Sequence, residues 1–307
     1  MLHDETFAPI VEAAADRLTT VLARDTPALG VRVLPWLASL SRTRKLADYF
    51  LHPRRFPMLL LPWWALDGTR SREDHSFHED VARSTMAGYC YIRLLDDVMD
   101  RRGTPGLDLL PAAGVFHFEF QNAYHRHFAS DSPFWTLFRD RWLRAADQTA
   151  AGSAPDAGEL DQRAEATLGP VLIPIAAACL HAGVPERFEA WRPVVLELAR
   201  LEQFVDDVLD WQDDAARGQP NLVLAQAARR MREGETLLTW VVREGYAWAL
   251  DTARTRVAAA MGSAERLRND GLGKFVAARA ALIEELAADT APGLGQLAGL
   301  AKVFGER

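Results

Sequence analysis

The chain has 307 residues, of which 49% are hydrophobic, 25% are charged and 9% are aromatic. This is the composition of a globular protein with enough apolar residues for a full core, and it excludes a disordered chain. The 35 basic and 42 acidic residues give a formal net charge of -7, so no chain-wide positive field attracts nucleic acid, and a polyanionic ligand has to be bound locally.

The N-terminal segment does not have the pattern of a signal peptide. Its first 24 residues include four acidic ones, where a signal peptide carries basic residues followed by an apolar core. The longest apolar stretch, 171–180, is shorter than the roughly 20 residues that a membrane-spanning helix needs. Cys90 and Cys179 lie in apolar runs, which indicates buried thiols in a reducing compartment. We therefore expect a cytoplasmic protein without integral membrane association.

Apolar residues recur at helical spacing along nearly the whole chain, and sustained alternation of apolar and polar residues is scarce. Clusters of turn residues separate the helical runs at 102–106, 151–155, 183–185, 217–220 and 271–273. No segment has the length and Gly/Ser content of an interdomain linker, and no solenoid repeat is present. The sequence predicts an all-α, single-domain helical bundle over residues 1–307, large enough to enclose an apolar cavity.

The first motif that could bind a metal ion is Asp96-Asp97-Val98-Met99-Asp100, which follows an apolar helical run over 86–95. At 100° per residue, Asp96 and Asp100 fall about 40° apart on one helix face, and Asp97 flanks them. These carboxylates can therefore meet one cation.

The same spacing returns at Asp206, Asp207 and Asp210, with Asp213 and Asp214 in the same helix. The five carboxylates form a single stripe about 120° wide, where they repel one another unless counter-ions are present. Clustered oxygen ligands suit Mg²⁺, which is commonly shared between carboxylates and substrate phosphates. A solvated acidic face is the alternative, but two copies beside apolar helix argue against it.

Residues one and two turns before each motif are expected to line a substrate pocket next to the metal. The five candidates are Tyr89, Ile92, Arg93, Ala199 and Gln203. An aromatic ring such as that of Tyr89 stabilises a passing cation without reacting as a nucleophile.

At these motifs the chain resembles the class I isoprenoid synthases, which include prenyltransferases, squalene and phytoene synthases and terpene cyclases. Residues 203–210 look like the second aspartate motif of polyprenyl diphosphate synthases, and 211–223 are more similar to the continuation of that motif in terpene cyclases. On the cyclase alignment the metal ligands fall on Asp206, Asp210 and Asp214. The resemblance implies three Mg²⁺ ions, held between two helices by a set of catalytic and metal-binding carboxylates: Asp96, Asp97, Asp100, Asp206, Asp207, Asp210 and Asp214.

The resemblance also implies arginine contacts to an isoprenyl diphosphate. Arg101 and Arg102 follow the first motif directly, about a helical turn from the arginines of prenyltransferases, and complementing a helix C-terminus is their ordinary alternative role. Arg217 belongs to an Arg-Gly pair shared with cyclases. Arg163 matches a diphosphate-sensing arginine imperfectly, with a surface residue as the alternative, and it precedes a helix break expected at Gly169-Pro170 and Pro174.

The pattern favours a terpene synthase that ionises an allylic isoprenyl diphosphate and cyclises or rearranges the carbocation. A prenyltransferase is the alternative. The basic motif that binds its second diphosphate is matched only weakly by residues 52–57, and the chain has only three lysines to supply such a site. A non-catalytic helical partner subunit is the other alternative. Substrate length and oligomeric state stay open, a homodimer included.

Overall fold

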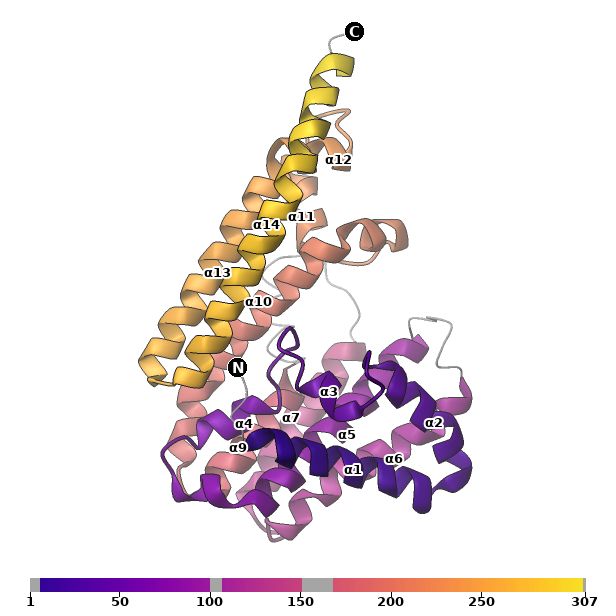
Figure 1. The fold of residues 1–307 in the computed structure, drawn as a ribbon, viewed down its shortest axis with the longest axis vertical. Helices are drawn as coiled ribbons and strands as arrows, with labels where there is room; N and C mark the ends of the chain where they lie inside the picture. Colours follow the sequence, from indigo (N-terminus) through magenta and orange to yellow (C-terminus); the bar gives the residue numbers. More distant parts are fainter. Residues whose placement is uncertain (1–5, 100–106, 151–167, 306–307) are drawn as a thin grey trace. The chain divides into compact units, whose positions relative to one another are not determined.

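The computed structural model describes residues 6–99, 107–150 and 168–305, and every regular element in these ranges is helical (Figure 1). No strand occurs in the described ranges, so the all-α prediction is confirmed. The chain forms two compact units. The N-terminal unit comprises 1–143 and 169–191, and the C-terminal unit comprises 144–168 and 192–307. A single domain over the whole chain stays a prediction.

The N-terminal unit is built around one long helix, α5, which packs against α1, α6 and α9. Its α-helices are α1 (Phe7–Arg24), α2 (Pro27–Ser39), α3 (Leu46–Phe50), α4 (Leu60–Ala65), α5 (His75–Met99), α6 (Pro111–Asn122), α7 (Pro133–Ala150, which continues into the C-terminal unit) and α9 (Gly169–His181). Short 3₁₀ turns lie at η1 (Arg70–Glu73), η2 (Leu107–Leu109) and η3 (Tyr124–Arg126). Gly88 lets α5 approach α6 closely, because a Cβ there would lie 2.9 Å from the Phe120 ring.

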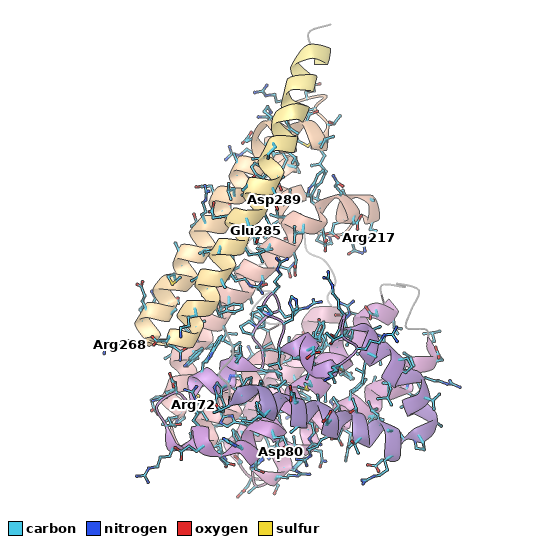
Figure 2. The ribbon with its side chains drawn as sticks, in the orientation of Figure 1. Arg72, Asp80, Arg217, Arg268, Glu285 and Asp289 are labelled. Atoms are coloured by element: carbon cyan, nitrogen blue, oxygen red, sulfur yellow. The ribbon has the colours of Figure 1, made fainter. Side chains whose placement is uncertain are left out.

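The first half of α5 buries charged side chains in a network. Asp80, Arg83 and Glu119 are 1%, 3% and 4% exposed, and Arg83 forms an ion pair with Glu119 of α6. Asp80 (labelled in Figure 2) forms an ion pair with Arg126, whose Nη1 lies 3.1 Å from Asp80 Oδ1. The His127 Nε2 lies 3.0 Å from the other carboxylate oxygen of Asp80. Burial opposes ionisation of Asp80, but these partners outweigh it and hold its pKa below the ordinary range. The network therefore keeps buried charges paired.

The C-terminal unit is a set of helices around the C-terminal half of α10. Its elements are α10 (Pro185–Arg217, whose first residues belong to the N-terminal unit), α11 (Leu222–Arg230), α12 (Leu237–Trp240), the π-helical turn η4 (Val241–Gly245), α13 (Tyr246–Leu267) and α14 (Asp270–Gly305). Helices α13 and α14 run antiparallel and side by side (Figure 1). The Tyr246 hydroxyl donates to the Ala287 carbonyl at 2.8 Å and joins the two helices.

Some of the predicted turns are confirmed and one is wrong. Gly183 and Gly218 adopt positive φ angles of 70° and 67° after α9 and α10, where the sequence predicts turns. The turn predicted at 271–273 lies two residues earlier, because Arg268 takes the left-handed conformation and the Asn269 carboxamide accepts from the Leu272 N–H at 2.9 Å. This side-chain cap starts α14 at Asp270 and leaves the glycines inside the helix.

The break predicted at Pro174 is also absent, since α9 begins at Gly169 and continues through Pro174 to His181. A proline inside a helix costs about 3 kcal/mol, because it removes a hydrogen bond and clashes with the preceding turn. Here Leu172, Ile173 and Ile175 are fully buried and α9 packs on α4 and α5, so tertiary packing outweighs the local cost.

Both cysteines are free and buried, as the sequence predicts, and burial raises the pKa of the Cys179 thiol to about 12. Within the described ranges, no helix combines the length and the hydrophobicity that crossing a bilayer requires.

We expect the substitution Glu119→Gln to lower the free energy of unfolding of the protein by about 3 kcal/mol, because it leaves Arg83 buried with less compensating charge. The matched control is Glu79→Gln. Glu79 pairs with Arg17, whose side chain is 41% exposed, so this change should cost under about 1 kcal/mol. Urea unfolding followed by circular dichroism measures both values. Equal losses in the two variants would contradict the role given to the buried pair.

Candidate functional site

The first aspartate motif lies at the C-terminal end of α5, as predicted. Asp96 is exposed, whereas Asp97 is only 6% exposed. The Arg93 Nε lies 3.1 Å from an Asp97 carboxylate oxygen, one turn back on the same helix. Arg93, predicted as a pocket residue, therefore neutralises the buried member of the motif. Asp100 and the two arginines that follow it lie outside the described residues.

Aromatic rings gather one turn before Arg93. The ring centroids of Tyr49 and Phe50 lie 5.4 and 5.3 Å from that of Tyr89, and the Tyr49 and Tyr89 hydroxyls share a hydrogen bond. Burial, with Tyr49 adding to it, raises the pKa of Tyr89 above its ordinary value. The sequence indicates Tyr89 alone, because Tyr49 and Phe50 are brought to it by the folding of α3 from a distant part of the chain.

The second aspartate motif lies on α10 and has a similar division. Asp206 and Asp210 are exposed, and Asp207 is 5% exposed. The Gln203 carboxamide donates to one Asp207 oxygen at 2.9 Å, and the Leu222 N–H donates to the other at 2.9 Å. Burial raises the pKa of Asp207, and these two hydrogen bonds oppose that effect.

Asn221 joins the end of α10 to the start of α11. Its Nδ2 donates to the Asp207 backbone carbonyl at 2.8 Å and to an Asp214 carboxylate oxygen at 2.9 Å. Its Oδ1 accepts from the Val223 N–H at 2.8 Å and caps α11. Residues 221–223, the end of the stretch that resembles terpene cyclases, therefore form the capped start of α11. An Asn before an apolar run is the sequence signal that could have indicated this cap.

The two motifs share one local arrangement, each within its own unit. In both, the first aspartate is exposed and the second is buried, and the residue four positions earlier binds the buried carboxylate. A buried carboxylate without such a partner would cost several kcal/mol. Each helix therefore fixes one carboxylate and presents another to solvent.

Glu202 and Arg279 are missing from the sequence prediction of the site, although they lie beside it. Glu202 is one turn before Asp206 and about 40° from it around α10. Its carboxylate lies 2.6 Å from the Nε of Arg279 on α14, and Arg279 is 7% exposed. Burial raises the pKa of Glu202 to about 7, with Arg279 opposing the rise and Asp206 adding to it. An acidic residue four positions before the motif is the signal that could have been used.

Three of the remaining predicted site residues lie within the described ranges. Ile92 and Ala199 are half-buried on α5 and α10. Arg217 is exposed at the C-terminal end of α10, where its Nη2 lies 3.5 Å from an Asp213 carboxylate oxygen (Figure 2). Arg163 lies outside the described residues.

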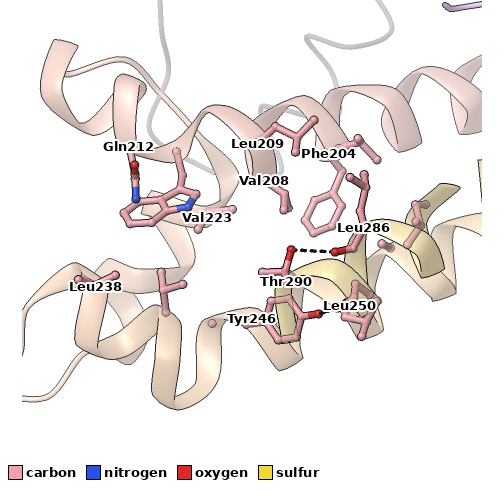
Figure 3. A pocket seen from close by; sticks show the side chains of 18 residues that line it. Phe204, Val208, Leu209, Gln212, Val223, Leu238, Tyr246, Leu250, Leu286 and Thr290 are labelled. Atoms are coloured by element: carbon pink, nitrogen blue, oxygen red, sulfur yellow. Dashed lines mark hydrogen bonds between the residues drawn. The ribbon is translucent and has the colours of Figure 1, made fainter. Parts of the chain in front are cut away.

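A cavity of about 350 Å³ lies within the C-terminal unit, and it borders the other side of α10 (Figure 3). Phe204 and Val208, which line it, are about 160° around the helix from Asp206. Ala199 and Gln203, predicted to line the substrate pocket, do not line this cavity. No acidic residue of α10 lines the cavity, although Leu209, which does, lies only about 40° around the helix from Asp213.

Comparisons with known proteins give no match to this chain, either from a family model or from a curated protein. The resemblance to class I isoprenoid synthases therefore stays a prediction. Its physical support comes from the residues of the two motifs and from their geometry.

Glu202 should make the stability of the protein depend on pH in the neutral range. Because its folded pKa lies above the unfolded value, its contribution is full below about pH 4.5 and is lost as the pH rises to about 7. We expect Glu202→Gln to flatten the decline in the free energy of unfolding between pH 4.5 and about pH 7, the two pKa values that bound it.

Chemical unfolding at a series of pH values measures this decline. Glu285→Gln is the control, since Glu285 is exposed on α14 (Figure 2). If the wild type and Glu202→Gln decline in parallel, Glu202 does not titrate as the geometry requires.

Proposed function

We propose that this chain is a magnesium-dependent class I terpene synthase, which ionises an allylic isoprenyl diphosphate and cyclises or rearranges the resulting carbocation. The observation that carries the proposal is the shared arrangement of the two motifs, in which a buried, anchored aspartate adjoins an exposed one. Solvated acidic faces have no need of a buried carboxylate with its own anchor. The proposal includes the isoprenoid synthase fold, for which the all-α architecture is a necessary condition.

The donor set of the C-terminal unit fits magnesium. Asp206 and Asp210 present exposed carboxylates on one helix face, and Asn221 holds the Asp214 carboxylate on the same stripe. Oxygen donors of this kind are what Mg²⁺ prefers. When bound, magnesium would neutralise the charge of the diphosphate leaving group.

The chain's own residues would supply preorganisation and protection of the cation. Arg93 and Gln203 fix the buried aspartates, so the carboxylate positions are set before substrate arrives. The rings of Tyr49, Phe50 and Tyr89 offer π-faces that attract a carbocation. The hydroxyls of the two tyrosines bind each other, which lowers their availability as nucleophiles.

A prenyltransferase is the second candidate, and one observation favours it. Arg54 and Arg55 are exposed in the loop after α3, and the Arg55 guanidinium lies 4.3 Å from the Tyr49 ring centroid. This places a basic group beside the aromatic cluster, where a second diphosphate could be attracted. Gln203, which resembles the glutamine of polyprenyl diphosphate synthases, is equally compatible with this candidate.

The proposal is tested by incubating the protein with Mg²⁺ and each of the C10, C15 and C20 allylic diphosphates, with and without isopentenyl diphosphate. We expect a hydrocarbon or terpene alcohol from one allylic substrate alone. Asp206→Asn should lower kcat/KM at least about a hundredfold, a loss of roughly 2.7 kcal/mol in transition-state stabilisation. Asp251→Asn, an exposed change on α13, should leave turnover unchanged.

Other outcomes separate the alternatives. A longer diphosphate, formed only with isopentenyl diphosphate, identifies a prenyltransferase. Full activity in EDTA contradicts metal dependence. If no substrate turns over, but Mg²⁺ with inorganic diphosphate raises the melting temperature more than either alone, the site binds its ligands without catalysis, as a partner subunit would.

The predicted pocket face of α10 has its own test. Ala199 is seven residues before Asp206 and about 20° from it around the helix, so its methyl group is expected to border the hydrocarbon tail of the substrate. We expect Ala199→Phe to shorten the accepted substrate or redirect the product, because bulk added to a shaped cavity is poorly tolerated. Ala215→Phe is the control, since Ala215 is exposed on the far side of the same helix.

Product analysis by gas chromatography measures the change, and the melting temperature checks folding. A folded Ala199→Phe protein with wild-type products and relative rates would place the substrate tail elsewhere.

A further inference from the structure

The cavity of the C-terminal unit has a lining without charge. Its 18 residues come from α10, α11, α12, η4, α13 and α14, and none is acidic or basic, although a quarter of the chain is charged (Figure 3). We propose that this cavity binds an uncharged hydrocarbon chain, either isoprenoid or straight alkyl. The proposal does not depend on the proposed enzymatic function, because none of the aspartates of the acidic stripe lines the cavity.

The two hydroxyl groups of the lining are already engaged, which leaves the Gln212 carboxamide and the Trp211 indole N–H as its other polar side-chain groups. The Tyr246 hydroxyl donates to the Ala287 carbonyl at 2.8 Å, and the Thr290 hydroxyl donates to the Leu286 carbonyl at 2.7 Å (Figure 3). A polar or charged ligand entering here would lose hydration without equivalent partners. A hydrocarbon loses nothing of this kind and gains about 25 cal/mol for each Å² of apolar surface removed from water.

The wall is shaped by an unusual backbone. The π-helical turn η4 contributes Val241 and Gly245 to the lining, and such turns occur frequently at functional sites. Gly245 lies close to the buried Trp240 ring, because a Cβ added to Gly245 would be 2.6 Å from a ring atom of Trp240. A residue larger than glycine would therefore clash with the Trp240 ring at this part of the wall. Its volume of about 350 Å³ is at the low end of the range for small-molecule sites, about 300–1,000 Å³.

The entrance is apolar as well. Leu209, Leu238 and Leu286 line the cavity, yet they are 60%, 48% and 36% exposed. Large apolar side chains that line a cavity and are still exposed offer apolar surface that a ligand can cover. A chain-like ligand would cover them while its end points to solvent.

Quenching of tryptophan fluorescence by 11-bromo-1-undecanol tests the proposal, because Trp211 lines the cavity. We expect saturable quenching that is largely lost in Trp211→Phe. Farnesol, a branched isoprenoid alcohol, and 1-undecanol are the competitors. Stronger displacement by farnesol assigns an isoprenoid ligand, and stronger displacement by undecanol assigns a straight chain. Quenching that is unsaturable, or unchanged in Trp211→Phe, overturns the proposal.

Two pairs of variants locate the bound chain. Ala249→Leu fills the cavity from α13 and should weaken binding at least tenfold, whereas Ala258→Leu, exposed on the same helix, should not. Ala287→Leu fills it from α14, with the exposed neighbour Ala288→Leu as its control, and serves if Ala249→Leu does not fold. The melting temperature of the filled variants should be equal or higher.

Wild-type binding by a folded filled variant contradicts the site.

The last outcome concerns a second copy of the chain. Light scattering that shows a dimer, converted to monomer by Leu238→Glu, together with absence of quenching, would mean that a partner chain covers the opening instead.

Discussion

Burial of a carboxylate removes its hydration, and that cost has to be offset by hydrogen bonds or by an opposite charge. Both aspartate motifs meet this requirement in the same way. Asp97 has Arg93 one turn back, and Asp207 has Gln203 one turn back together with the Leu222 N–H. The second arrangement also decides where α11 begins, because its first backbone donor points at the Asp207 carboxylate. A local electrostatic requirement therefore determines how α10 connects to the next helix.

Helix α10 illustrates how one element serves two purposes. Its acidic stripe includes the exposed Asp206 and Asp210, while Phe204 and Val208 on the other side face the apolar cavity. Side chains on one helix face recur every three or four residues, so charge and hydrophobicity can be interleaved in the sequence and still be separated in space. The two faces also differ in their contacts, since Asp207 and Asp214 on the acidic side are bound by Leu222 and Asn221, whereas Phe204 on the other side packs against apolar residues of α13.

The helix that carries the first motif follows the same requirement along its length. The first half of α5 buries Asp80 and Arg83, each with partners from α6 or from the residues after it. A buried network with every charge paired holds its members in one arrangement, since any shift leaves a charge without compensation.

The sequence by itself determined the helical class, the positions of the two motif helices and the burial of the cysteines, because these depend on apolar periodicity and on composition. It singled out Gln203 and Arg93 only as pocket residues, and their contacts to the buried aspartates one turn away on the same helix appear in the structure. Tertiary structure decided the partners that come from distant segments. Tyr49 reaches Tyr89 from α3, and Arg279 reaches Glu202 from α14.

Packing also overrode local signals at Pro174, where burial kept a helix that proline disfavours, and a side-chain cap at Asn269 started a helix before two glycines. The cavity was beyond the sequence for a related reason, since its walls combine six elements whose apolar residues look individually like ordinary core. Periodicity identifies which face of a helix is apolar, but the space left between such faces is decided only when the helices pack.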